Sequence, residues 1–313
     1  MSAVYWLARW GTVLAGWTPP ALRQALGRAA GGASNLAWRS KRQVTRENMA
    51  QVTGRSPNDP YVRRLAYTSW VNYGRYASDF LNFANIDAEA IERECSDASV
   101  GASWKEYIDQ AREAGRGTIL ASAHFGNWDM AGVIVGRHMR PHAVADTFKD
   151  PRLDKLIQSQ REAKGVHIIP LEGSARRLLR VLQQNEIVGL VTDRPLPPGE
   201  GVEITFFGRK TSVPAGPGTL ALKTGAPIVA GFVWYGSDRR FCIRTYPPIF
   251  PQKGAARDAE IARLTQYIYT ALEEVVRAYP SQWYMFRPFW PAQTALPPLE
   301  EQAEKQPAIQ ESV

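Results

Sequence analysis

Between residues 115 and 290, short apolar runs alternate with segments of helical periodicity, and this alternation limits the fold more than any other feature of the sequence. The apolar runs cover residues 118–121, 166–170, 187–192 and 227–234. Successive strand–helix units form a mainly parallel sheet with helices on both of its faces. The sequence therefore predicts an α/β fold with a mainly parallel central sheet flanked by helices.

The first apolar run leads into the sequence TILASAHFGNWDMAG at residues 118–132. Read as strand, turn and helix, this stretch puts His124 at the carboxyl end of a strand and Asp129 in the first turn of the next helix. Ligands of open α/β sheets bind at that edge. His124 is therefore a candidate general base, and Asp129 or a neighbouring group is expected to fix its tautomer.

A histidine five residues before an aspartate also occurs as a purely structural pair, so the surroundings of His124 decide between the two interpretations. Gly126 allows a tight backbone turn, and Asn127 is a preferred residue at a helix N-cap. An apolar strand comes shortly before the histidine. These three features favour a functional site.

The excess positive charge of the chain lies in its N-terminal part. Residues 1–64 contain ten Lys or Arg and two acidic residues, a balance of +8 that equals the formal net charge of the whole chain. Residues 65–313 contain 28 residues of each sign. A nucleic-acid binder more often spreads basic side chains over its main domain, so this distribution favours an anionic membrane surface as partner over nucleic acid.

Residues 3–17 are apolar apart from Arg9, and they include Trp6, Trp10 and Trp17. A helix of this length spans about 22 Å, which is less than the roughly 30 Å of a bilayer's hydrocarbon core. Tryptophan is enriched at membrane–water interfaces. We therefore expect N-terminal membrane-associating helices that lie in the interface. A helix packed on the protein's own core is the alternative.

Several motifs follow one another in an order that is similar to a known family. They are the H-x4-D box from His124 to Asp129, RENMA at 46–50, DR at 193–194, GVEITFFG at 201–208, PAGP at 214–217, KTGAP at 223–227 and QWYM at 282–285. This series resembles the bacterial lysophospholipid acyltransferase-like superfamily, in its branch of lipid A lauroyl/myristoyl acyltransferases and phosphatidylinositol mannoside acyltransferases.

Two of these motifs, NWD in the box and VEITFFG, look more similar to the mannoside branch. Lipid A enzymes often carry Glu at the last position of the box. They also often carry a Tyr/Phe–Arg pair where this chain has Phe148 and Lys149. The resemblance therefore points more to a mannoside-type acceptor than to lipid A.

The resemblance implies an O-acyltransferase that moves a fatty acyl chain from acyl-CoA or acyl carrier protein to a hydroxyl of a membrane phospholipid or glycolipid. It implies peripheral attachment to the cytoplasmic face of the cell membrane, and neither a metal nor a cofactor. The other three histidines lack partners at metal-site spacing. A thioester is already activated, so no serine nucleophile is needed, and the sequence has no Gly-x-Ser-x-Gly elbow.

Other functions stay open beside a phosphatidylinositol mannoside acyltransferase. Within the same class they are a lipid A-type lauroyl/myristoyl acyltransferase and a lysophospholipid acyltransferase. The alternative of another class is an inactive lipid-binding homologue. The domain prediction is membrane-associating basic and aromatic helices at 1–56, an acyltransferase α/β domain at 57–291 and a disordered tail at 292–313. Residues 1–291 are expected to form one structural unit.

Glu203 is predicted as a second catalytic residue. It alternates with apolar neighbours on a strand that we expect beside the same sheet edge as His124, and the resemblance to the mannoside branch favours it. Glu203 is thus the expected partner of His124, with Asp129 positioning His124 and its loop. A solvent-facing strand residue is the alternative for Glu203.

Four basic residues are predicted to hold phosphates of the donor or the acceptor. Arg209 and Lys210 are expected in a turn before a helix N-terminus, a placement that suits anions. Arg194 follows a strand and Lys149 comes just before a helix. Ordinary surface charge is the alternative for all four.

Overall fold

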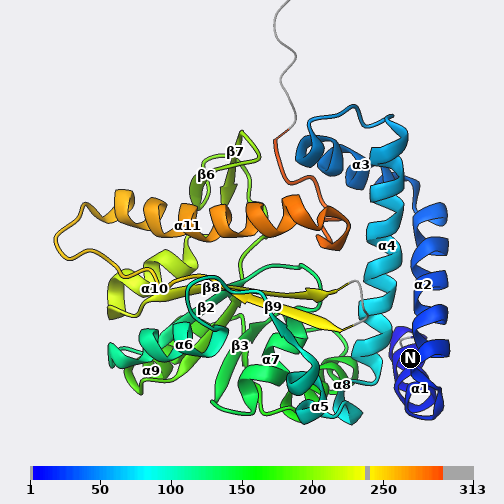
Figure 1. Cartoon of the computed structure of the whole chain (residues 1–313), viewed down its shortest axis with the longest axis horizontal. Helices are drawn as coiled ribbons and strands as arrows, with labels where there is room; N and C mark the ends of the chain where they lie inside the picture. The colour runs from blue at the N-terminus through cyan, green and yellow to red at the C-terminus, as the bar shows by residue number, and fades with distance from the viewer. Residues whose placement is uncertain (1–2, 237–239, 292–313) are drawn as a thin grey trace, which may run out of the picture.

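A computed structural model describes residues 3–236 and 240–291 of the chain (Figure 1). The predicted tail at 292–313 lies outside the described residues. The helices, with short 3-10 turns written η, are α1 Ala3–Trp17, α2 Pro20–Ala37, α3 Arg39–Thr53, α4 Pro60–Leu81, η1 Phe83–Asn85, α5 Ala88–Glu94, α6 Trp104–Glu113, α7 Trp128–Gly136, α8 Pro151–Glu162, α9 Ser174–Gln183, α10 Gly216–Thr224, α11 Arg257–Ala278 and η2 Pro280–Gln282. The strands are β1 Ser96–Asp97, β2 Thr118–Ser122, β3 Pro141–Ala145, β4 His167–Pro170, β5 Ile187–Val191, β6 Val202–Phe206, β7 Arg209–Val213, β8 Ile228–Tyr235 and β9 Phe241–Thr245.

The main sheet has the strand order β1-β9-β8-β2-β5-β3-β4, and β6 pairs with β7 in a separate hairpin. The central strand β2 runs parallel to β5 and β8, and β3 runs parallel to β5 and β4. β9 runs antiparallel to β8. The predicted mainly parallel sheet is therefore confirmed. Its central strands are covered on both faces, which explains why they read as continuous apolar runs in the sequence.

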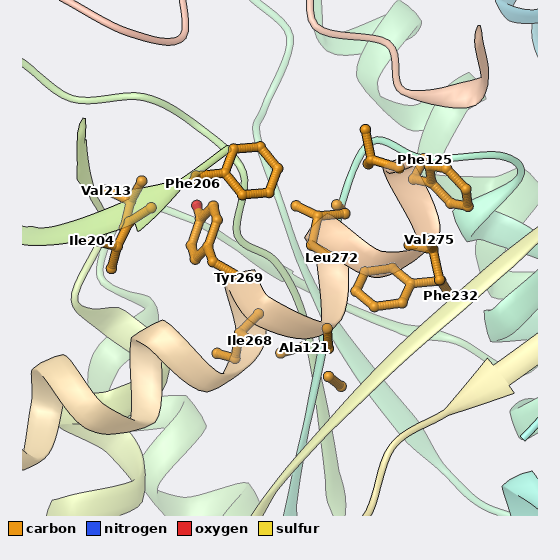
Figure 2. Close-up of a cluster of buried hydrophobic side chains, with 14 of the residues drawn as sticks. Ala121, Phe125, Ile204, Phe206, Val213, Phe232, Ile268, Tyr269, Leu272 and Val275 are labelled. Carbon is orange, nitrogen blue, oxygen red and sulfur yellow. The ribbon is translucent and has the colours of Figure 1, made fainter. Parts of the chain in front are cut away.

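Helices cover both faces of the sheet. Successive side chains of a strand point to opposite faces, so the apolar strands present apolar side chains on both faces, and helices bury them. On one face α11 packs Leu272 and Val275 in the same core cluster as Ala121 and Phe232 (Figure 2). On the other face Leu120 and Val229 pack in a cluster with residues of α6 and α7. The hairpin β6–β7 packs on the far side of α11, where Tyr269 meets Phe206 (Figure 2).

The long helix α4 stands beside the carboxyl ends of the strands, with α2 along its outer side (Figure 1). The backbones of α2 and α4 touch through glycines. A Cβ added at Gly31 would lie 2.1 Å from the carbonyl oxygen of Trp70, and one at Gly74 would lie 2.1 Å from that of Gly27. Only glycine permits this approach. The helix α2 is thus anchored directly to α4.

Two local expectations differ from the structure. The low helix propensity of glycine would favour an end of α2 near Gly31 and Gly32, but the helix continues to Ala37, because its glycines pack against α4 and this tertiary contact outweighs their propensity. Arg209 and Lys210 do not lie in a turn before a helix, as predicted, but begin β7. The turn is made by Phe207 and Gly208, whose φ angles of 48° and 74° are those of a tight hairpin.

Within residues 3–236 and 240–291, no helix is both long and apolar enough to cross a membrane. Instead, α1 carries large apolar side chains on its surface, with Leu7 74%, Leu14 62% and Trp17 86% exposed. These side chains are available for a partner of apolar character, and the membrane association of these helices stays a prediction.

Candidate active site

The loop after β2 holds His124 in a fixed position. The backbone N–H of Gly126 donates to the carbonyl of Gln282 at 2.8 Å, and that of Asn127 donates to the carbonyl of Val233 at 2.8 Å. Gly126 has a φ of +57°, and a Cβ there would lie 2.2 Å from the carbonyl oxygen of Val233, so this position requires glycine. Asn127 caps α7 by accepting from the N–H of Met130. The predicted turn and N-cap are confirmed.

The carboxylate that bonds to His124 belongs to Asp193, just after β5. Nδ1 of His124 lies 2.8 Å from Oδ1 of Asp193, and the backbone N–H of His124 donates to both oxygens of that carboxylate at 3.0 and 3.1 Å. Because β2 and β5 are neighbours in parallel register, with Ser122 opposite Val191, their carboxyl ends bring the two residues together. An ionised carboxylate can only accept, so Nδ1 carries the hydrogen and Nε2 keeps its lone pair.

Two residues of the C-terminal segment, Trp283 and Tyr284, donate hydrogen bonds to Asp193 and His124. The indole N–H of Trp283 donates to Oδ2 of Asp193 at 3.0 Å, and the backbone N–H of Tyr284 donates to the carbonyl of His124 at 2.9 Å. Trp283 and Asp193 are both fully buried, whereas the imidazole side chain of His124 is 46% exposed. The arrangement is therefore a buried, oriented carboxylate behind a ring that is open to a substrate.

The electrostatics of the pair favour a basic imidazole. Partial burial opposes the charged ring, but the charge and hydrogen bond of Asp193 outweigh it and raise the pKa of His124 above its ordinary value. The charge of Asp129 adds to this effect, and the exposed guanidinium of Arg287 opposes it. Burial also opposes ionisation of Asp193, yet His124 and the donated hydrogen bonds hold the pKa of that carboxyl below its usual range. A histidine held in this way suits general base catalysis.

Asp129, the last residue of the H-x4-D box, forms a second buried network and does not bond to His124. Its carboxylate accepts from the hydroxyl of Tyr76 at 2.7 Å and from Nε of Arg161 at 2.7 Å. These contacts join α7 to α4 and α8 directly behind the histidine loop. Trp128 lies between the two networks, with its ring 4.0 Å from that of Tyr76 and 5.1 Å from that of His124. The positioning of the loop by Asp129 stays a prediction.

The predicted pairing of Glu203 with His124 is wrong in this structure. Glu203 lies on β6, which pairs with β7 and does not join the edge of the main sheet. Its side chain is 59% exposed and forms an ion pair with Lys210 at 2.7 Å. The strand alternation was correct, but it turns Ile204 and Phe206 inward and leaves Glu203 on the outer face.

The four predicted phosphate-binding residues separate into two groups. Arg194 follows Asp193 and pairs with Asp146 at 3.2 Å, so it lies at the same sheet edge as His124. Lys149 comes just before α8 and lines a surface cavity of about 660 Å³ between Val4 of α1 and residues 148–153. Lys210 is paired with Glu203 on the hairpin.

Arg209, the last of the four, is held by the protein itself. Its guanidinium donates to Oε1 of Gln51 at 3.3 Å and to the carbonyl of Pro291 at 2.9 Å. The structure thus places Arg194 at the same sheet edge as His124. The two hairpin residues, Arg209 and Lys210, instead contact other groups of the protein.

In the described ranges, no three His, Cys, Asp or Glu side chains are grouped so as to hold a metal ion. His142 lies 2.6 Å from a carboxylate oxygen of Glu186, and His138 contacts Glu92. These histidines are therefore engaged in pairs with single carboxylates.

Comparison with known proteins places the chain in a family. The chain matches, over residues 1–291, the family described as bacterial lipid A biosynthesis acyltransferase, and it belongs to that family. It is therefore an enzyme that transfers acyl groups.

The chain is 32% identical to a phosphatidylinositol mannoside acyltransferase of Mycobacterium tuberculosis (strain ATCC 25618 / H37Rv). That similarity extends over 267 residues, 83% of this chain and 80% of the relative. It is 31% identical to a protein of the same name from Mycolicibacterium smegmatis over 286 residues, which cover 88% of this chain and 89% of that relative. The resemblance seen in the sequence is confirmed.

Asp193 and Trp283 are the residues of the site that sequence analysis did not select. Both occur in motifs that were recognised, the DR pair at 193–194 and QWYM at 282–285. The available signal for Asp193 was its place at the end of a predicted strand, because carboxyl ends of parallel strands share one edge. For Trp283 the sequence offers no comparable signal, since it lies in an irregular segment.

Proposed function

We propose that the chain transfers a fatty acyl group from a thioester, either acyl-CoA or acyl carrier protein, to a hydroxyl of a phosphatidylinositol mannoside-type glycolipid. The observation that carries the proposal is the pair of His124 and Asp193 at the carboxyl edge of the sheet. Nδ1 of His124 lies 2.8 Å from Oδ1 of Asp193, and the side chain of His124 is 46% exposed. The two relatives named as mannoside acyltransferases support the acceptor class.

The chemistry follows from the protonation of the pair. Nε2 of His124 takes the proton of the acceptor hydroxyl as that oxygen attacks the thioester carbonyl carbon. The C–S bond then breaks, and the leaving sulfur takes the proton back from the imidazolium. The products are an ester and a free thiol. Asp193 keeps the ring in the required tautomer and stabilises the imidazolium between the two steps.

Arg194 and Lys149 are proposed to bind phosphate groups of the donor or the acceptor. Arg194 stands next to Asp193, and its partner Asp146 is itself 66% exposed, so a substrate phosphate can compete for the guanidinium. Replacing either residue by Ala should raise the KM for donor or lipid more than it lowers kcat, because such contacts act in binding. An unchanged KM for both substrates would refute this assignment.

We further propose that the enzyme attaches peripherally to the cytoplasmic face of the membrane. The exposed Leu7, Leu14 and Trp17 of α1 supply an apolar surface that fits the bilayer interface. The excess of basic residues at 1–64 adds attraction to anionic lipid. Both features support an interfacial helix.

The proposed function is tested by turnover of acyl-CoA by the full chain in the presence of three acceptors. These are a phosphatidylinositol mannoside, a lysophospholipid and a lipid A precursor, with the ester identified by mass spectrometry. The mannoside is expected to give the acylated product fastest. An ester formed only on the lysophospholipid or only on the lipid A precursor would reassign the acceptor, and no ester on any lipid would support an inactive lipid-binding homologue.

A further inference from the structure

The helices α2, α3 and α4 meet at one corner of the molecule (Figure 1). A second cluster of charge, which shares no residue with the histidine site, lies between these three helices. It surrounds a cavity of about 590 Å³. We call it the arginine pocket, and its polar lining consists of Asn35, Arg42, Arg46, Arg63, Arg64 and Tyr67. Among the described residues, none that lines this pocket is acidic. The described lining therefore presents four positive charges and no counter-charge.

The arginines of the pocket lack carboxylate partners among the described residues. Arg42 donates to the carbonyls of Asn35 and Leu36 at the end of α2, at 3.0 and 2.8 Å, and so helps to terminate that helix. Arg64 stands over the ring of Tyr61 at 5.9 Å. Arg46 and Arg63 have no ion pair within the ranges that the structure covers.

Two buried donors in the pocket are left without an acceptor. Nε of Arg46 and Nδ2 of Asn35 have no hydrogen-bond partner in the described part of the chain, and Asn35 is only 3% exposed. Nearly all buried polar groups in folded proteins are hydrogen-bonded to protein or to ordered water, so these two donors need an acceptor from water or from a ligand. Burial lowers the pKa of Arg46, and the charges of Arg63 and Arg42 lower that pKa further.

A ligand that completes this pocket must carry negative charge and several acceptor oxygens. Guanidinium groups bind phosphate through paired N–H donors, and hydrogen bonds between such charged groups are among the strongest in proteins. Leu36, which lines the cavity, is 67% exposed, and Trp38, two residues further along the chain, is 56% exposed. These apolar side chains suit the acyl region of a lipid more than a soluble ion.

We propose that the arginine pocket binds the phosphate of a phosphate ester, carried by an anionic phospholipid headgroup at the membrane surface. The pocket is separate from the histidine site, but α3 connects the two. Asn48, two residues after Arg46, donates to the carbonyls of Met285 and Arg287 at 2.9 and 2.8 Å, in the segment that contains Trp283. A headgroup held here would orient the enzyme on the bilayer.

The test compares two variants of the full chain that each lose two positive charges. Arg46→Gln with Arg63→Gln alters the pocket, and Arg39→Gln with Lys41→Gln alters the start of the same helix α3 outside it. Binding is measured by cosedimentation with phosphatidylcholine vesicles containing phosphatidylinositol. Vesicles with a fatty acid at the same negative charge serve as the control lipid. No acyl donor is present, so the outcome is independent of the proposed acyl transfer.

The pocket variant is expected to bind phosphatidylinositol vesicles about thirtyfold more weakly, which corresponds to ~1 kcal/mol for each of two charges near the surface. The control variant should lose much less, and fatty-acid vesicles should bind both variants alike. Equal losses in the two variants, or equal binding of the two vesicle types by the parent, would overturn the proposal in favour of diffuse charge attraction.

Soluble phosphate distinguishes the source of the ligand. If inorganic phosphate binds the parent more tightly than the pocket variant, while the parent shows no preference for phosphatidylinositol vesicles, the phosphate chemistry is right and the lipid source is wrong. Thermal unfolding confirms that the variants fold. Should the double variant unfold, Arg63→Gln alone repeats the test, because Arg63 is exposed and its loss leaves no buried group unpaired.

Discussion

The histidine site at the sheet edge and the arginine pocket at the junction of α2, α3 and α4 are both charged clusters, yet their hydrogen bonds are completed to different degrees. At the sheet edge, Asp193 accepts from His124 and Trp283, and Asp129 accepts from Tyr76 and Arg161. In the arginine pocket, Arg46 and Asn35 keep buried donors without acceptors among the described residues.

The difference between the two regions suggests two roles for buried polar groups, one in catalysis and one in ligand binding. A satisfied network holds its members in one geometry, as a general base requires. An unsatisfied cluster is costly unless a ligand completes it. The first network should therefore respond to substitution in turnover and stability, and the second in binding.

The largest expected effect comes from removing the base. His124→Ala should lower kcat by at least about 10²-fold and up to about 10⁴-fold, because a positioned base contributes that much. Binding to phosphatidylinositol vesicles should not change, since the arginine pocket is untouched. Initial rates of thiol release from acyl-CoA and cosedimentation measure the two quantities. A parallel loss of vesicle binding would show that the two regions are not separable.

The next effect concerns stability. Asp129→Ala removes the acceptor of Tyr76 and leaves the guanidinium of Arg161, only 18% exposed, without its counter-charge. Breaking a buried pair in this way costs about 3–5 kcal/mol in the free energy of unfolding. Asp146→Ala is the control, because it breaks the exposed pair with Arg194 and should cost less than about 1 kcal/mol. Urea unfolding measures both, and equal losses would contradict the structural assignment of Asp129.

Turnover tests whether Asp193, as the structure shows, or Glu203, as the sequence predicted, is the partner of His124. Asp193→Asn keeps the shape of the side chain but removes the charge that stabilises the imidazolium, so kcat should fall by about 10² to 10³-fold. Glu203→Gln changes an exposed ion pair with Lys210 and should leave kcat within a few-fold of the parent. The reverse ranking would restore Glu203 as the partner of His124.

The smallest effect is a shift of the pH profile through Trp283. The base acts only when His124 is neutral, so kcat/KM falls as the pH drops through its pKa. Since that pKa is raised, the half-maximal rate should lie above about pH 6.5. Trp283→Phe removes the N–H dipole that offsets part of the Asp193 charge, so the imidazolium becomes more stable. The half-maximal rate should then move to still higher pH, by less than about one unit.

Trp290→Phe is the matched control for this experiment, because the indole of Trp290 donates at 3.1 Å to the carbonyl of Phe206 and not to Asp193. It should lower stability by a similar amount and leave the pH midpoint unchanged. If both variants shift the midpoint equally, Trp283 acts only through packing.

Much of this enzyme is determined locally and was predictable from the sequence. Strand and helix alternation predicts the parallel sheet, and the apolar run before His124 predicts its place at a carboxyl edge. Gly126 and Asn127 predict the turn and the cap. These features depend on residues within a few positions of one another, which is why a single sequence contains them.

The tertiary structure decided which groups meet. Asp193 is 69 residues from His124, and Trp283 is 90 residues from Asp193. Hydrophobic periodicity shows that a strand exists, but it does not give the order of strands in a sheet, so the sequence left Asp129, Glu203 and other groups open as partners of His124. The adjacency of β2 and β5 selected Asp193, and the pairing of β6 with β7 removed Glu203 from that edge. The arginine pocket likewise exists only because glycine contacts bring α2 against α4 and place Asn35, Arg46 and Arg63 around one cavity.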